Sequence, residues 1–124
     1  MKGFNRAVYL LLGGVILALS AVALVRPEVA LHREEASPLT RHLVQEQAAG
    51  GVFLGGMALW CAFHLERRRP VHLGLLLFTF LFAAIHWVEY LHARRMLVSP
   101  LLNSVPFVIL VLASRPWPGE ADPR

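Results

Sequence analysis

Long apolar runs separated by short polar stretches make up most of the chain. No run alternates polar and apolar residues, so the pattern favours helices and gives no support to strands. Each run is close to the ~20 residues that a helix needs to cross a hydrocarbon core of about 30 Å. The pattern predicts an all-α integral membrane protein, an antiparallel four-helix transmembrane bundle. The expected organisation is one membrane domain over residues 1–115, with spans over about 7–25, 45–65, 71–92 and 97–114, and a disordered tail over 116–124.

Serine-proline pairs mark two of the expected helix starts. Ser37 can cap a helix whose first residue is Pro38, because a serine oxygen accepts from the first turn and proline lacks only an amide that is free there. Ser99 and Pro100 repeat this signal before the last run. Pro106 lies inside that run, where the missing backbone hydrogen bond predicts a kink.

Two segments keep an alternative interpretation. The first run follows Lys2 and Arg6 and ends near a small-x-small sequence at residues 21–23, so a signal peptide is the alternative to a span. Its length exceeds the usual apolar region of a signal peptide, about 7–15 residues, which favours the span. The loop 26–43 is expected either to form a short interfacial helix over a pocket or to be a solvated connector.

Composition and charge agree with a membrane protein. Hydrophobic residues make up 56% of the chain and charged residues 16%, compared with about 45–50% and about 25% in soluble domains. The formal net charge of +4 comes mostly from arginines beside the apolar runs, which indicates membrane anchoring, so we expect the lipid bilayer as partner and no nucleic acid. A single cysteine, Cys61, excludes a disulfide framework within the chain.

The distribution of cations gives an orientation. With four spans, the termini and the turn 66–70 share one side, and the loop 26–43 and residues 94–95 lie on the other. The first side carries Lys2, Arg6, Arg67, Arg68, Arg69, Arg115 and Arg124, and the second carries Arg26, Arg33, Arg41, Arg94 and Arg95. The excess predicts cytoplasmic termini.

Glycines recur at a small-residue spacing on the first two runs. Gly13 and Gly14 form a strip on the first, and Gly51 and Gly55 form one on the second. Small residues let helix backbones approach closely, which is how helices pack in lipid. The strips are expected to pack the bundle internally, with a homodimer or a larger membrane complex as the alternative.

Polar residues gather on the side opposite the termini. The candidate binding residues of a pocket there are His42, Glu46, His86, Glu89, Tyr90 and Asn103. Spacings of four and three residues place each His-Glu pair on one helix face. Ionisable residues near the boundary of the hydrocarbon core are functional candidates. The alternative is that these groups cap the bundle by pairing with arginines. On the termini side, His64 and His72 are interpreted as interfacial residues.

No complete catalytic or metal motif is present in the sequence. Glu89 and His92 have the spacing of carboxylate di-iron bundles, but the second such motif is missing. Haem ligation by His42 and His86 would require them to face each other across the bundle. We therefore expect no catalytic residue, metal or cofactor, with quinone, haem or metal as alternatives.

The sequences YLLLGGVIL and QEQAAGGVFLGGMAL, together with a proline after the first run and a charged end to the third, resemble small four-helix bacterial membrane proteins of the DoxX-like kind. The resemblance implies a four-helix bundle, and some members of that group are linked to quinone or thiosulfate oxidation or to redox homeostasis. No functional residue of the group matches a position here. The expected function is a non-enzymatic accessory or interaction subunit with a polar pocket on the non-cytoplasmic side. The alternatives are a quinone- or metal-linked oxidoreductase component and a small proton-coupled transporter.

Overall fold

The protein, described here from a computed structural model, is all-helical over residues 2–31, 37–93 and 97–114, and those residues contain no strand. The elements are α1 (Lys2–Val25), the 3₁₀ turn η1 (Pro27–Ala30), α2 (Pro38–Phe63), α3 (Arg69–Ala93) and α4 (Val98–Leu112). The expected all-α class with four helices is confirmed. The predicted disordered tail and loop residues 32–36 and 94–95 lie outside the described residues.

Of the two serine-proline pairs, only Ser37-Pro38 forms the expected capped helix start. The Ser37 hydroxyl accepts from the Thr40 amide at 3.1 Å, and the Thr40 hydroxyl accepts from the Ser37 amide at 2.9 Å, which forms a reciprocal capping box. The last helix differs, because it begins at Val98 and has no side-chain cap. Pro100 is tolerated because the first helical turn needs no amide donors, and the helix continues through Pro106.

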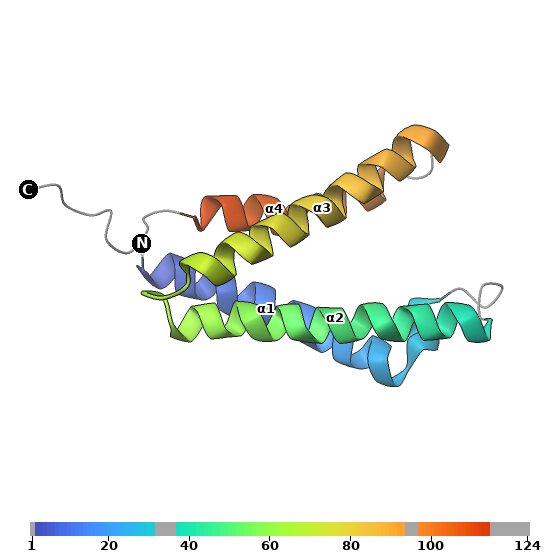
Figure 1. Ribbon diagram of the computed structural model, residues 1–124, viewed down its shortest axis with the longest axis horizontal. Helices are drawn as coiled ribbons and strands as arrows, with labels where there is room; N and C mark the ends of the chain where they lie inside the picture. The colour runs from blue at the N-terminus through green and yellow to red at the C-terminus, as the bar shows by residue number, and fades with distance from the viewer. Residues whose placement is uncertain (1, 32–36, 94–96, 115–124) are drawn as a thin grey trace, which may run out of the picture.

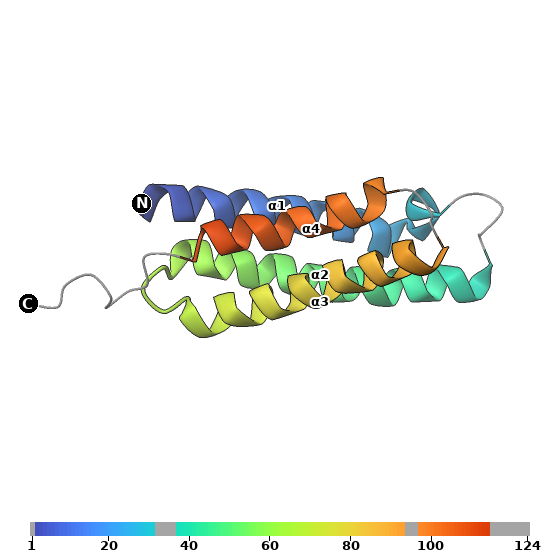
Figure 2. The same cartoon turned by 90° about the horizontal axis from the view of Figure 1, so that it is seen from above.

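The helices form two pairs that share one end. Helix α1 packs along α2, and α3 packs along α4. Figure 1 shows the pairs approaching each other at the end that holds the N-terminus and the α2–α3 turn, and Figure 2 shows the helices from above, with α3 and α4 in front of α1 and α2. They separate toward the end where α2 begins and α3 finishes (Figure 1). We call these the closed end and the open end.

Glycines allow α1 and α2 to approach closely. A Cβ atom at Gly13 would lie 2.9 Å from the carbonyl oxygen of Gly55, and one at Gly55 would lie 2.9 Å from the amide nitrogen of Leu17. A Cβ atom at Gly51 would overlap the side chain of Ser20. Gly14, in contrast, would meet nothing within 4 Å. The contact within one chain therefore uses Gly13, Gly51 and Gly55, and a homodimer or larger complex stays a prediction.

Apolar side chains cover much of the outside. Two helices, Lys2–Val25 and Arg69–His92, are long and apolar enough to cross a membrane, and in each case only 17% of the most apolar stretch is buried. Leu11 and Leu19 of α1 are both 67% exposed. Apolar patches of this extent on a protein surface usually contact lipid or another protein.

The glycine contact predicts that alanine substitutions at two neighbouring glycines change the stability by different amounts. Gly13→Ala should lower the free energy of unfolding by about 1–3 kcal/mol, because the added methyl group meets backbone atoms that can move only with the helix. Gly14→Ala should be neutral or stabilising by up to about 1 kcal/mol, because alanine is the better helix former and the site is open. Thermal unfolding of both proteins in the same detergent measures the difference, and equal shifts would contradict the packing described here.

Candidate functional site

A buried polar cluster holds the helices together at the closed end. The His72 side chain is fully buried, and its Nδ1 atom is hydrogen-bonded to the Tyr9 hydroxyl. Its Nε2 atom lies 3.1 Å from the Ser114 hydroxyl, which follows α4. Because that hydroxyl donates its single hydrogen to the Leu110 carbonyl at 3.0 Å, Nε2–H donates to Ser114, and Nδ1 accepts from Tyr9. One neutral imidazole thus joins α1, α3 and the end of α4.

Arginines from the turn and from α1 extend this cluster. Arg68 is 2% exposed, and its guanidinium carbon lies 5.4 Å from the centre of the Tyr9 ring. With its oxygen facing Arg68, the Asn5 amide accepts from both terminal nitrogens at 3.0 Å. Arg6 donates from Nε to the carbonyl of Ala62 at 3.2 Å, which satisfies a backbone acceptor near the end of α2. The closed end is therefore held by polar contacts in an otherwise apolar core.

His72, which the sequence suggests is interfacial, is covered by the protein itself. Its ring is completely covered, whereas His64 is exposed and stacks on Trp60 with ring centroids 4.6 Å apart. The available signal was a lone histidine one residue inside an apolar run, in which an unpaired polar group is unfavourable. The sequence could not identify Tyr9 as its partner, because the two residues are 63 positions apart.

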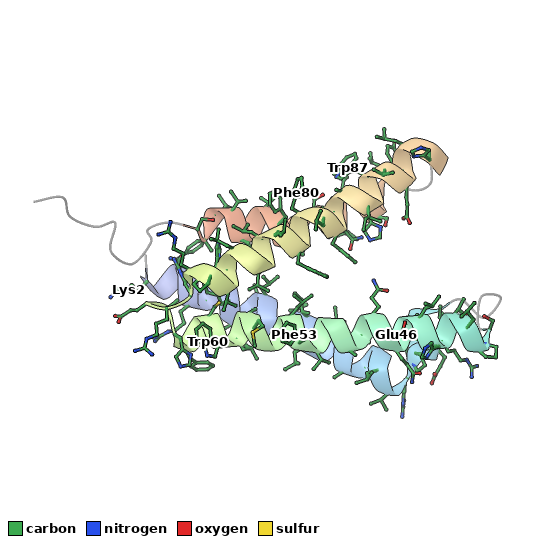
Figure 3. The ribbon with its side chains drawn as sticks, in the orientation of Figure 1. Lys2, Glu46, Phe53, Trp60, Phe80 and Trp87 are labelled. Carbon is green, nitrogen blue, oxygen red and sulfur yellow. The ribbon has the colours of Figure 1, made fainter. Side chains whose placement is uncertain are left out.

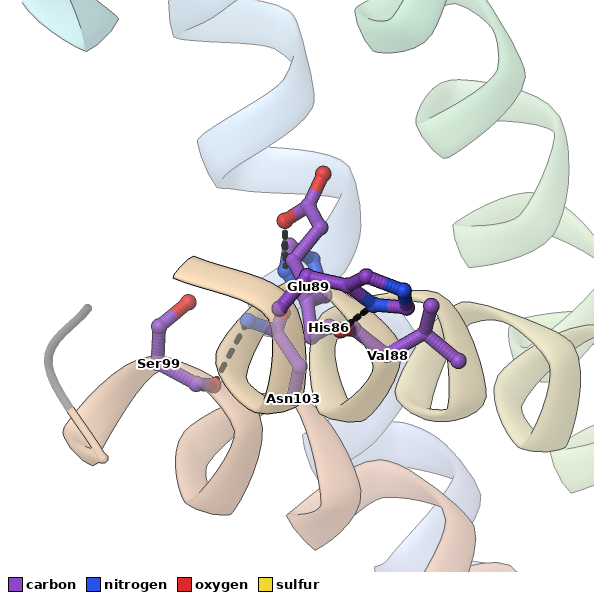
Figure 4. A network of polar contacts seen from close by, with 6 residues as sticks. His86, Val88, Glu89, Ser99 and Asn103 are labelled. Atoms are coloured by element: carbon purple, nitrogen blue, oxygen red, sulfur yellow. Dashed lines mark hydrogen bonds and ion pairs between the residues drawn. The ribbon is translucent and has the colours of Figure 1, made fainter. Parts of the chain in front are cut away.

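The polar residues predicted to share a pocket lie at the open end without converging. His42 Nε2 is 3.3 Å from Glu46 on α2, and His86 Nδ1 is 3.5 Å from Glu89 on α3. Asn103 donates to the Ser99 carbonyl at 2.8 Å on α4. Figure 4 shows the α3 and α4 contacts side by side, each within its own helix.

Tyr90 packs edge-on against Trp87, with ring centroids 6.0 Å apart. Trp87 also donates to the hydroxyl of Ser104 at 3.0 Å, which links α3 to α4 at the open end. Within the described residues, no three His, Cys, Asp or Glu side chains are grouped closely enough to hold a metal ion.

A cavity of about 600 Å³ lies between the two helix pairs. Every helix and η1 contribute to it, and most of its lining is aliphatic or aromatic. The polar lining residues are Ser20, Gln47, Thr79 and Asn103. Among the described residues that line the cavity, none is ionisable. Of the six residues predicted to form a polar pocket, Asn103 is the one that lines this cavity.

The polarity of the cavity changes along its length. Leu12, Ala58, Leu75 and Leu110 line it and also belong to the buried hydrophobic core, so they form an apolar floor toward the closed end. Gln47 lines it about 16 Å from Ala58 along α2 and is exposed. The cavity therefore has an apolar floor, and toward the open end its lining, here called the rim, carries two carboxamides beside apolar residues such as Val29 and Val44.

One of the deeper polar groups of the cavity is satisfied within its own helix. The Thr79 hydroxyl is buried and donates to the Leu75 carbonyl at 2.8 Å. At the rim, the Asn103 side-chain amide donates one hydrogen to the Ser99 carbonyl, and its own carbonyl oxygen remains available as an acceptor. The rim carboxamides and the Ser20 hydroxyl are thus the lining groups able to bind a polar part of a ligand.

Comparison with family models, with curated proteins and with solved structures finds no match to the chain.

The buried imidazole predicts a large difference between two histidine variants. His72→Leu should lower the free energy of unfolding by about 1–3 kcal/mol, because the Tyr9 hydroxyl loses its buried acceptor. His64→Leu should change it by no more than about 0.5 kcal/mol, because that ring is exposed. Thermal or denaturant unfolding in detergent provides the measurement. If His72→Leu leaves the free energy of unfolding unchanged, the cluster does not hold the closed end.

Proposed function

We propose that the protein is a small, non-enzymatic integral membrane protein that binds one hydrocarbon chain in the cavity between its helix pairs. The observation that carries this proposal is the cavity of about 600 Å³, which is lined mainly by apolar side chains from all four helices. Small-molecule sites commonly measure about 300–1,000 Å³ and are mostly apolar with a few polar groups. The proposed role is the accessory one expected from the sequence. The proposed binding surface is the apolar cavity instead of the polar residues of the open end.

The exposed apolar surface supports insertion in a bilayer. Two helices are long and apolar enough to cross, and most of their apolar stretches are not covered by the chain itself. Helix α2 has 26 residues and is about 39 Å long, so its polar first turns would extend beyond a core of about 30 Å. Helix α4 has 15 residues and is about 22 Å long, so we propose that it crosses with local thinning of the bilayer.

Lipid physics favours a hydrocarbon occupant. The atoms lining an empty apolar cavity lose dispersion contacts on one side. In a bilayer, a hydrocarbon chain can supply those contacts without leaving an apolar medium. Water is disfavoured, because a buried water needs 2–4 polar partners and the floor of this cavity offers only Leu and Ala side chains.

We also propose that the closed end faces the cytoplasm of a bacterial inner membrane. In the described residues the closed end carries Lys2, Arg6, Arg67, Arg68 and Arg69 with one carboxylate, Glu66. At the open end, Arg26 and Arg41 are accompanied by Glu28, Glu46 and Glu89. An excess of cations on one side is the usual determinant of orientation. The bacterial inner membrane is proposed from the resemblance to DoxX-like bacterial proteins, which stays a prediction.

Blocking the cavity should abolish chain binding. The probe is an alkyl chain with a mid-chain diazirine, photolysed with the full-length protein in nanodiscs, and the readout is labelling that excess unlabelled dodecane suppresses. Ala23→Trp should weaken this saturable labelling by about tenfold or more, because the indole occupies the cavity that Ala23 lines. Ala21→Trp is the matched control, because Ala21 is exposed and two residues away along α1.

Peptide mapping locates the saturable label. The proposal expects it on residues that line the cavity, and Ala21→Trp should keep it. Saturable labelling that survives Ala23→Trp unchanged, or labelling that dodecane never suppresses, would refute a chain-binding cavity.

The orientation is tested by the accessibility of introduced thiols. In a Cys61→Ala background, Arg41→Cys should react with a membrane-impermeant maleimide applied to the periplasmic face, because position 41 lies at the open end. Arg67→Cys should react only after the membrane is permeabilised, because it lies in the α2–α3 turn. Equal reactivity of both thiols in sealed cells would be incompatible with the proposed topology.

A further inference from the structure

We propose that the occupant of the cavity is an uncharged amphiphile, a single hydrocarbon chain that ends in a hydroxyl or carbonyl group, and that Gln47 and Asn103 bind this polar end. This inference rests on the proposed function and specifies the chemical class of its ligand. It depends on three features of the cavity: the absence of ionisable groups in its described lining, its polarity gradient and its two rim carboxamides.

The described part of the lining offers no partner for a charged head group. Among the described residues that line the cavity, none carries a charge that could compensate a carboxylate, phosphate or ammonium. Transfer of an uncompensated charge into an apolar site is far more unfavourable than transfer of a hydroxyl or carbonyl group. The open-end contacts of His42 with Glu46 and of His86 with Glu89 are formed by residues outside the lining.

The polarity gradient orients the ligand. The floor is made of the buried side chains of Leu12, Ala58, Leu75 and Leu110, so it accepts only the hydrocarbon part. Along α4, Asn103 lies about 10 Å from Leu110, and along α2, Gln47 lies about 16 Å from Ala58. A chain with its tail on the floor would therefore place its polar end at the carboxamides after about 10–16 Å.

The two carboxamides are suited to a neutral polar group. Gln47 belongs to α2 and Asn103 to α4, so they lie on walls that different helix pairs provide. Each amide offers an acceptor as well as donors, so the pair can accept a hydrogen from a hydroxyl and donate to its oxygen. Since Asn103 already donates to Ser99, its carbonyl oxygen is the atom we assign to a ligand hydroxyl. Burying a ligand without such bonds would leave its polar end desolvated.

The class of ligand is tested by competition against the photoreactive alkyl chain on the wild-type protein in nanodiscs. The competitors are 1-dodecanol, dodecane and laurate, the last at a pH where its carboxylate is ionised. We expect 1-dodecanol to compete at an about tenfold lower concentration than dodecane and laurate to be weaker than the alcohol. Dodecane equal to the alcohol, or laurate stronger than it, would overturn the assignment of a neutral head group. Failure of all three to compete would instead overturn the cavity itself.

Variants of the rim assign the preference to residues. Gln47→Leu and Asn103→Leu should each reduce the preference for 1-dodecanol over dodecane by about threefold or more while leaving competition by dodecane in place. Gln45→Leu is the matched control, because Gln45 lies outside the cavity lining and its amide donates to the Leu24 carbonyl at 3.2 Å. If both rim variants keep the full preference, or the control loses it equally, the two carboxamides do not bind the head group.

Discussion

His72 stands where three helices meet, and its two ring nitrogens are both occupied, by Tyr9 of α1 and by Ser114 beyond α4. An imidazole that is fully buried in an apolar core is unfavourable unless both nitrogens are satisfied, so the three helices must converge on it. Elsewhere the α1–α2 and α3–α4 pairs touch each other only sparsely. The relative placement of the pairs, and with it the shape of the cavity, therefore depends on this side chain, on the arginine cluster around it and on the buried apolar core that joins Leu12, Leu75 and Leu110.

The glycine contact gives the arrangement its second constraint. Because Gly13 and Gly55 bring the backbones of α1 and α2 together, those helices form one close-packed arm. Helix α3 is joined to α4 at the open end by the hydrogen bond from Trp87 to Ser104, which makes a second arm. Two arms held at one end leave a wedge of space at the other, and the wedge is lined by the apolar faces that each arm turns inward. Figure 3 shows these inward faces, with the labelled Lys2 and Trp60 at the closed end.

This geometry connects the packing to the proposed ligand. The polar groups that maintain the closed end are already bonded to one another, so they hold the arms together without entering the cavity. At the rim, by contrast, Gln47 and Asn103 keep hydrogen-bonding capacity where the arms are apart. An amphiphile bound there would contact both arms. Ligand binding and the separation of the arms are then linked, since a ligand that contacts both arms stabilises the separation at which both contacts form.

The amino-acid sequence by itself determined the local features: four apolar helices without strands, the capped start of α2 at Ser37, and a glycine strip able to pack helices. These depend on periodicity and on neighbours within a turn, which a linear sequence displays. Only the tertiary structure decided that Gly13 packs while Gly14 does not, that His72 is buried, and that the His-Glu pairs lie outside the cavity lining. Each of those outcomes depends on how two helices are rotated and crossed relative to each other, and that geometry arises from contacts between residues far apart in the chain.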